Sequence, residues 1–274
     1  MISVVVCAKN EESRIELCLK SILQNNFSEI IVIDGDSNDR TVEIAKNFTS
    51  NIIISKSKSL TVDRQIGIDA ANNSLIAMID ADHILKPDDI ENLVKDLDTL
   101  KLDMVQSQLS NYFNDSFLNK AESELMTFQH NIPGQRKMIG TAPTIYKKEI
   151  FDYVKFDGNI SKKMDDSDFI YRLNRLKKFK IGIGYTSITT FHHPNLSDYI
   201  NKWIWYGYGD GEFINKHPIN TLSTLFHILI RYPIIYSIKA LMLKKYRAIP
   251  FTIIYGLTRF YGLIKFFLIQ IFKK

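Results

Sequence analysis

The chain has 274 residues, of which 45% are apolar and 24% charged, so it can bury a substantial core as one large domain or two small ones. Its two cysteines, Cys7 and Cys18, exclude a disulfide framework and predict reduced, buried thiols. A strand-like run starts at Ile2, without the charged and apolar regions of a secretory signal. We therefore expect the catalytic part to stay on the cytoplasmic side.

The net charge of +5 hides a strong asymmetry along the chain. Ten of the 35 basic residues and none of the 30 acidic residues follow Glu212, so residues 1–212 carry a net charge of −5. This split predicts an anionic partner for residues 213–274 alone. The many Phe, Ile, Leu and Tyr residues of this tail favour a membrane surface over nucleic acid, because a nucleic-acid-binding arm needs no such apolar content.

Apolar strand-like runs alternate with helical patterns along the first hundred residues. The predicted strands cover residues 2–7, 29–34, 51–55 and 75–80, and the predicted helices cover 11–24, 39–47, 60–72 and a segment opened by Pro87. This order predicts an α/β fold, a mostly parallel, Rossmann-like sheet with helices on both faces. Such sheets bind ligands at the carboxyl ends of their strands. We therefore expect residues 8–11, 34–39 and 80–82 to converge on one edge.

The turn after the first strand reads Ala8-Lys9-Asn10-Glu11 and lacks a glycine-rich phosphate loop. This excludes a dinucleotide fingerprint and a P-loop, so bound phosphates need another positive charge. Two carboxylates on a short turn, Asp80 and Asp82, can hold a divalent cation that bridges phosphate oxygens. Taken alone, the D-x-D pattern is explained equally well as a solvated turn with a helix-capping Asp.

Four segments occur together in an order that is more specific than any one of them. They read "VVVCAKNEESRIELCLKSIL", "IIVIDGDSNDRTVEIAK", "DRQIGIDAANNSLIAMIDADHILKPDDI" and "MDDSDFIYRL". In this order they resemble the family 2 glycosyltransferases of the GT-A fold, over roughly residues 2–210. The resemblance implies a nucleotide-diphospho-sugar transferase that moves a sugar from an activated donor to an acceptor.

The resemblance also implies roles for individual residues on the donor side. Residues in contact with the nucleotide sugar would be Ala8, Asn10, Glu11, Asp34, Asp36, Arg64, Asp80 and Ala81. Within this set Asp34 would bind the base, with Asp36 as the alternative, and Arg64 would face the diphosphate. Asp80 would reach the ribose or the metal.

The predicted cofactor is a divalent cation, Mg²⁺ or Mn²⁺. Asp80 and Asp82 are its expected ligands, and His192 or His193 is the candidate for a further one, although this pair can equally end a strand before Pro194. His83 is interpreted as a turn residue. Polyprenyl-phosphate mannosyltransferases carry a Gln where this chain has Ile84, which disfavours the simplest version of that activity.

The segment from Met164 to Leu173 predicts a helix with acids clustered at its N-terminus. The helix dipole favours a charged carboxylate there, which suits a general base, and the resemblance assigns this role to Asp166. Plain N-capping by Asp165 or Asp166 is the alternative. One base without a second nucleophile implies a single displacement with inversion. Gly140, Thr141 and Asp165 are expected on the acceptor side.

The tail can lie on a bilayer or span it. A spanning helix needs about 20 largely apolar residues, whereas the longest uncharged run, His217 to Ile230, has 14. Arg259 and Lys265 fall near one helical face, a pattern that favours amphipathic helices at an anionic membrane surface. A spanning or re-entrant hairpin and an oligomer-forming face are the alternatives.

The sequence therefore predicts an inverting, metal-dependent glycosyltransferase at the cytoplasmic face of the membrane, where it is peripheral. The donor would be a nucleotide-diphosphate sugar, and the acceptor a lipid-linked molecule or a glycan in surface glycan, glycolipid or glycoprotein synthesis. Alternatives are a polyprenyl-phosphate sugar synthase, a GT-A-like nucleotidyltransferase and an inactive membrane-anchored binding module. We expect a catalytic domain over 1–212, divided into donor (1–100) and acceptor (101–212) halves, and a membrane-associated tail over 213–274.

Overall fold

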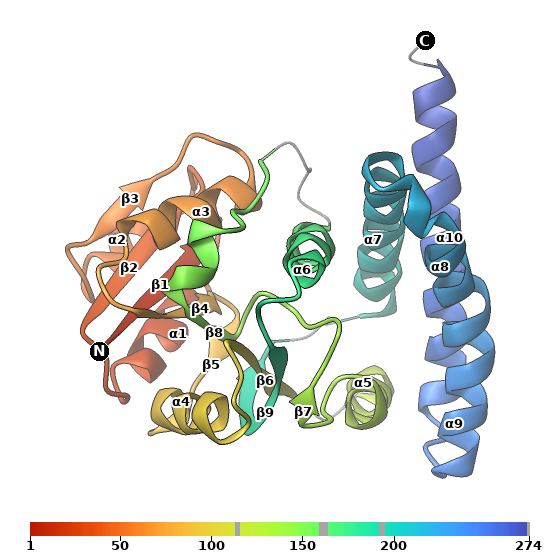
Figure 1. Ribbon diagram of the computed structural model, residues 1–274, viewed down its shortest axis with the longest axis horizontal. Coiled ribbons are helices and arrows are strands. Elements are labelled where there is room, and N and C mark those ends of the chain that lie inside the picture. The colour runs from red at the N-terminus through yellow and green to blue at the C-terminus, as the bar shows by residue number, and fades with distance from the viewer. Residues whose placement is uncertain (113–115, 159–163, 192–194, 273–274) are drawn as a thin grey trace. The chain divides into compact units, whose positions relative to one another are not determined.

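The computed structural model describes residues 1–112, 116–158, 164–191 and 195–272 (Figure 1). Two compact units make up the chain. The first contains residues 1–110, 130–158 and 166–191, and the second contains the described parts of 111–129, 159–165 and 192–274. The first holds the predicted donor edge, and the second holds the basic tail.

The first unit is built on a sheet whose order is β3-β2-β1-β4-β8-β6-β9-β5. Its parallel part contains β1 (Ile2–Ala8), β2 (Glu29–Asp34), β3 (Ile52–Ile54) and β4 (Leu75–Asp80). The intervening helices are α1 (Ile15–Ile22), α2 (Thr41–Ala45) and α3 (Leu60–Ala70). These elements confirm the predicted strand–helix alternation.

The rest of the sheet is antiparallel. It contains β5 (His83–Ile84), β6 (Met104–Asn111), β7 (Gly134–Gln135), β8 (Thr144–Lys147) and β9 (Ile181–Thr190). Strand β8 runs antiparallel to both β4 and β6, and β5 and β7 run antiparallel to β9. The sheet is therefore mixed. Its parallel strands, β1 to β4, are the ones whose ends form the predicted donor edge.

Alternating side chains of the buried strand β1 fill two cores, one on each face of the sheet. Val4 and Val6 pack with α1 and with α4 (Asp89–Thr99). Val5 and Cys7 pack with α3, with α6 (Asp165–Arg175) and with the 3₁₀-helix η1 (Lys148–Asp152). Figure 1 shows these helices around the sheet. Helix α4 begins at Asp89, two residues after Pro87, which therefore precedes the helix instead of opening it.

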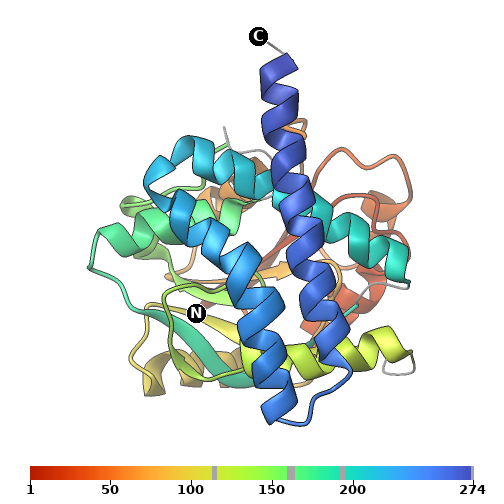
Figure 2. The ribbon, with the colours of Figure 1, turned by 90° about the vertical axis from the view of Figure 1, so that its right-hand side faces the viewer.

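The second unit is helical. It contains α5 (Phe117–Gln129), α7 (Leu196–Lys216), η2 (Pro218–Asn220), α8 (Thr221–Phe226), the π-helical η3 (His227–Tyr236), α9 (Ser237–Met242) and α10 (Ala248–Phe272). Two stretches of 25 residues, Pro218–Met242 and Ala248–Phe272, are long and apolar enough to cross a membrane by length and composition. They lie side by side in Figure 2. The helical path continues through Arg231, so an uncharged run underestimates its length.

Helix α7 packs closely along α10 because glycines meet at the crossing. A Cβ on Gly207 would overlap the backbone of Arg259, and a Cβ on Gly262 would overlap the backbone of Ile204. Arg259 donates from Nε to Oδ2 of Asp210 at 2.7 Å and from Nη2 to Oδ1 at 2.5 Å. The prediction that Arg259 faces lipid headgroups is wrong, because this ion pair buries it between the two helices.

Helix α7 belongs to the same compact unit as the tail, although most of it precedes residue 212. The compact units therefore do not coincide with the expected division at that residue. The division into donor half, acceptor half and tail stays a prediction about function.

Candidate active site

The turns after β1 and β2 hold each other through Asn10. Its backbone N–H donates to Oγ of Ser37 at 2.9 Å, and its Oδ1 accepts from the backbone N–H of Asn38 at 2.9 Å. Asn10 has a φ of 55°, a left-handed conformation that Asn tolerates better than most residues. Ala8 is buried at the end of β1 and pairs in register with Asp34 of β2. Two of the predicted donor segments are thus adjacent.

Asp34, the predicted base-binding residue, is only 1% exposed. Its Oδ1 accepts from the backbone N–H of Ser37 at 2.8 Å, and its Oδ2 accepts from Oγ of Ser37 at 2.5 Å. Both oxygens therefore hold the turn after β2. Asp36, the alternative, is exposed and has a φ of 64°.

Glu11, in the turn after β1, adds a further carboxylate to this edge of the sheet. Burial raises the pKa of its carboxyl, the Arg14 guanidinium opposes that shift, and the nearby Asp82 and Asp80 carboxylates add to it. Arg14 donates to Glu11 from Nε at 2.7 Å. The predicted donor segments around residues 8–11 and 80–82 therefore do converge, and they concentrate negative charge.

Asp80 and Asp82 follow β4 and form a cluster with His83. One ligand atom from each of the three residues lies within 4.8 Å of the others. Nδ1 of His83 accepts the backbone N–H of Asp80 at 3.0 Å, and Nε2 lies 3.7 Å from Oδ1 of Asp82. His83 is buried in β5, so its interpretation as a turn residue missed this contact. Ala81 is buried in the core between the two acids.

The chemistry of this cluster fits a divalent cation. Oδ1 of Asp82 is a buried atom that accepts no hydrogen bond from the described residues. A buried carboxylate oxygen without a donor is costly unless a cation or another ligand group satisfies it. Carboxylates are suitable ligands for both Mg²⁺ and Mn²⁺. Asp80 and Asp82 are the residues that would hold such an ion, and His83 lies beside them with its Nδ1 lone pair engaged by the Asp80 N–H.

Arg64 links this cluster to the predicted base. It lies on the inner face of α3 and is 5% exposed. Its Nη2 donates to Oδ1 and Oδ2 of Asp80 at 3.1 and 3.0 Å, and its Nη1 lies 3.5 Å from Oδ1 of Asp166. Arg64 thus spans two carboxylates that come from β4 and α6.

Thr141 supports Asp166 from the other side. Its Oγ1 donates to Oδ1 of Asp166, and its carbonyl oxygen accepts from the Tyr146 hydroxyl at 2.6 Å. Gly140 is held by a hydrogen bond from its N–H to Oε1 of Gln106 at 2.6 Å. Thr141 is only 1% exposed, so its contact is with the predicted base. Its expected role on the acceptor side stays a prediction.

The acids of the α6 block differ in environment. Asp168 is 1% exposed and accepts from Nε of Arg172 at 2.8 Å, a contact within α6. The Asp166 side chain keeps 36% of its surface exposed. Asp165 begins α6, and its side chain lies outside what the structure describes. His192 and His193 also lie outside the described residues, so their predicted metal contact stays a prediction.

The parallel half-sheet, the acidic strand ends and the antiparallel extension define a nucleotide-diphospho-sugar transferase fold of the GT-A class. The solved structure of residues 1–349 of S. aureus TarS has this fold and matches 97% of this chain and 88% of its own, with a TM-score of 0.54 at 15% identity. The family model for glycosyl transferase family 2 matches residues 3–155, more than half of the chain. The chain belongs to that family.

Curated relatives also match this chain at low identity. GlyA, a glycosyltransferase of Streptococcus pneumoniae, is 24% identical over 57% of this chain and 26% of its own length. A dodecaprenyl-phosphate galacturonate synthase of Rhizobium johnstonii is 27% identical over 58% of this chain and 51% of its own length. The chain thus spans between a quarter and about half of the length of these relatives.

Proposed function

We propose that the protein transfers a sugar from a nucleoside diphosphate sugar to an acceptor hydroxyl in a single inverting displacement. One observation carries this proposal: Arg64 contacts both Asp80 and Asp166. A carboxylate suited to the diphosphate side and a carboxylate suited to the acceptor side therefore stand on either side of one guanidinium. Among the solved likenesses, TarS has been crystallised with UDP and with UDP-GlcNAc, which supports a nucleotide sugar as donor.

The donor side needs positive charge where the diphosphate leaves. A divalent cation, when bound, supplies part of it by neutralising phosphate oxygens. Asp80 and Asp82 would provide its ligands, and Arg64 adds a fixed positive charge beside them. When the bond between the anomeric carbon and the diphosphate oxygen breaks, its electron pair moves to that oxygen. The positive charge of Arg64 stabilises the negative charge that develops on the diphosphate.

The acceptor side needs a base. Asp166 takes the proton of the acceptor hydroxyl while the acceptor oxygen forms a bond to the anomeric carbon. Thr141 and Arg64 both approach Oδ1 of Asp166, which fixes the orientation of the carboxylate. Because the attack comes from the face opposite the leaving diphosphate, the configuration at the anomeric carbon inverts.

The test is a screen of nucleotide sugars against the full chain with Mn²⁺, with Mg²⁺ and with EDTA. We expect one donor to bind and to be hydrolysed or transferred only with metal, and the product to have the inverted anomeric configuration by NMR. Full activity in EDTA would contradict the metal-dependent mechanism. Nucleotidyl transfer from a nucleoside triphosphate would replace it with the rival activity.

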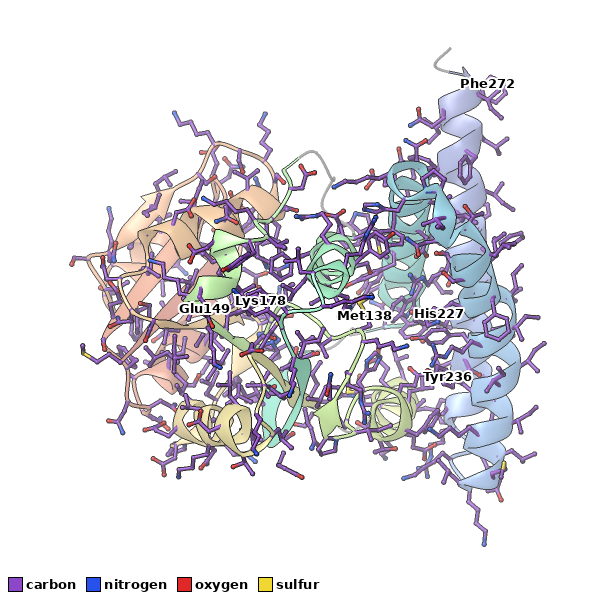
Figure 3. All side chains as sticks on the ribbon, viewed as in Figure 1. Met138, Glu149, Lys178, His227, Tyr236 and Phe272 are labelled. Atoms are coloured by element: carbon purple, nitrogen blue, oxygen red, sulfur yellow. The ribbon has the colours of Figure 1, made fainter. Side chains whose placement is uncertain are left out.

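A lipid-linked acceptor is the finer part of the proposal. The Rhizobium relative is named for a dodecaprenyl-phosphate product, and the second unit exposes large apolar side chains along its two long helices. Among the most exposed are Leu222, Met242 and Phe272, the last of which Figure 3 shows near the end of α10. Residues 213–274 carry ten positive and no negative charges. We therefore place the enzyme on the cytoplasmic face of an anionic membrane, with this unit in contact with the lipid.

Vesicle sedimentation of the full chain tests the membrane contact. Anionic vesicles should bind it more tightly than zwitterionic ones, because each basic residue near such a surface contributes on the order of 1 kcal/mol. High salt should release part of the protein and detergent all of it. Lys244→Gln with Lys245→Gln should weaken only the salt-sensitive part. A full chain that ignores anionic vesicles would reassign the exposed apolar surface to self-association.

A further inference from the structure

Asp63 is a buried carboxylate that the donor site has not yet used. It lies in the first turn of α3 and is only 6% exposed. Oδ1 accepts from Oγ of Ser57 at 2.7 Å. Within the described parts of the chain, Oδ2 receives no side-chain or backbone hydrogen bond, although it belongs to a residue that is more than nine-tenths buried. One acceptor oxygen of Asp63 is therefore held in place with its binding capacity unused.

Oδ2 lies on the side of Gly35 where a side chain would stand, directly after β2. A Cβ built on Gly35 would stand 3.2 Å from Oδ2 of Asp63 and 3.4 Å from both Cβ and Cδ of Lys9. Nζ of Lys9 donates to the carbonyl of Gly35 at 2.6 Å, and the N–H of Gly35 donates to the carbonyl of Ala8 at 2.9 Å. An apolar lysine stem, a bare glycine and a carboxylate oxygen thus meet beside the carboxyl ends of β1 and β2.

A comparison with Asp34 shows which of the two aspartates is better placed to accept a hydrogen bond from a nucleotide base. Asp34 has both oxygens engaged by Ser37 and is 1% exposed. Asp63 has one oxygen engaged by Ser57, and its other oxygen lies beside Gly35 at the end of β2. Each oxygen of Asp34 keeps a second lone pair, but the side chain is almost fully covered, so a base N–H would first have to displace a group that covers it.

We propose that Asp63, and not Asp34, recognises the base of the donor nucleotide, by accepting one N–H of its pairing edge through Oδ2. The proposal rests on the nucleotide-sugar donor proposed above. One available oxygen matches a base with a single ring N–H between two carbonyl groups, which is the edge of uracil. The Lys9 ammonium, with donors to spare beyond Gly35, can serve an adjacent carbonyl. Cytosine presents a lone pair at the same ring nitrogen and is repelled by the carboxylate.

The rival explanation is that Asp63 only ties the loop before α3 through Ser57. A purely structural residue would lower binding of all nucleotides equally when changed. A base-reading residue changes the ratio between two nucleotides that share the same diphosphate. The UDP-to-CDP ratio therefore separates the two roles.

The experiment is calorimetric titration of the full chain in detergent with UDP, CDP and pyrophosphate, each with Mn²⁺. The wild type should bind UDP at least about tenfold more tightly than CDP, because a hydrogen bond to a buried charged group is worth about 1.5–3 kcal/mol. Asp63→Asn should bring this ratio to about one, because its amide can also donate to cytosine. Asp69→Asn, at an exposed acid of the same helix, should leave the ratio unchanged.

Gly35→Ala tests the same site without changing Asp63. The added methyl group occupies the place between Lys9 and Asp63, so UDP binding should fall by about tenfold or more. Pyrophosphate binding should not change. Loss of pyrophosphate binding together with UDP binding would contradict the proposal.

An unchanged UDP-to-CDP ratio in Asp63→Asn overturns the assignment, and a ratio that moves in Asp34→Asn instead returns the base to Asp34. These outcomes leave the proposed function standing. A wild type that binds neither nucleotides nor pyrophosphate overturns the proposed function and the base assignment together.

Discussion

Each compact unit contains a buried arginine that pairs with an aspartate, and the two pairs differ in what surrounds them. Arg64 in the first unit contacts Asp80 and Asp166, whose side chains keep 30% and 36% of their surface exposed. Arg259 in the second unit contacts Asp210, whose side chain is 2% exposed. A ligand can therefore reach the carboxylate partners of Arg64, whereas the carboxylate partner of Arg259 is covered. We call the first the open pair and the second the closed pair.

This difference distinguishes a candidate ligand-binding site from an ion pair that only holds two helices together. A buried ion pair gains little net stability over apolar packing, but removal of one partner leaves a buried charge and is costly. In the second unit the cost falls on the packing of α7 against α10. In the first unit the exposed carboxylates lie near the ends of the sheet strands, where a ligand can bind to them. Variants of the two pairs should therefore separate loss of activity from loss of stability.

The largest expected effect is at Asp82. Asp82→Asn should lower the transfer rate by about a thousandfold or more, because an amide is a poor replacement for a carboxylate ligand and the cation contributes several kcal/mol. Manganese titration should show loss of metal-dependent nucleotide binding while the melting temperature stays near that of the wild type. Asp88→Asn, at an exposed acid near the same turn, is the matched control. Wild-type turnover in Asp82→Asn would remove the metal from the mechanism.

Next in size is the closed pair. Asp210→Asn should lower the free energy of unfolding of the full chain in detergent by about 3 kcal/mol, because Arg259 is left buried without its counter-charge. Chemical denaturation measures this change. Asp198→Asn on the same helix should cost less than about 1 kcal/mol.

The double variant Asp210→Leu with Arg259→Met sharpens this result. It replaces the ion pair by apolar packing and should regain most of the stability that Asp210→Asn loses. A single variant as stable as the wild type would show that Arg259 finds another partner or reaches water.

The sequence predicted the acidic strand end at Asp80 and Asp82 but not the buried ion pair between Arg259 and Asp210, and the reason is physical. Strand β4 and its acids form one local pattern, an apolar run that ends in Asp80-Ala81-Asp82, and a sheet edge brings such ends together by topology. Arg259 and Asp210 are 49 residues apart, and their pairing depends on glycines that let two helices approach. The contacts of His83 with Asp80 and Asp82 are local in sequence, but the sequence does not show that residues 83–84 pair with β9, which places His83 in a buried strand and not in a turn. The pairing of Arg259 with Asp210 has no local pattern at all.

The same reasoning explains the base assignment. The family resemblance assigned the base to Asp34, and the structure confirms that Asp34 lies at the end of β2. That both of its oxygens hold Ser37 depends on the conformation of the following turn, which the residue order alone does not give. Asp63 gave no signal because an acid in the first turn of a helix is normally read as complementing the helix dipole.

The third effect concerns the acceptor side of the open pair. Asp166→Asn should lower turnover by about a hundredfold or more, as expected when a general base is removed, with donor binding nearly unchanged. Single-turnover kinetics together with donor titration separates the two quantities. Asp168→Asn is the comparison, because its buried contact with Arg172 predicts lost stability instead of lost chemistry. A larger loss of turnover in a stable Asp168→Asn would move the base to that residue.

The smallest effect is at the residue that holds the base. Thr141→Val keeps the shape of the side chain and removes the hydroxyl that donates to Oδ1 of Asp166. One such hydrogen bond is worth about 1–2 kcal/mol, so turnover should fall by about tenfold at unchanged donor affinity. Because the charged carboxylate loses a donor, the acid limb of the pH–rate profile should also move to higher pH. Thr141→Ser retains the hydroxyl and should keep both the rate and the profile close to those of the wild type. A fall in rate without movement of the acid limb would show that the Thr141 hydroxyl orients Asp166 without stabilising its charge.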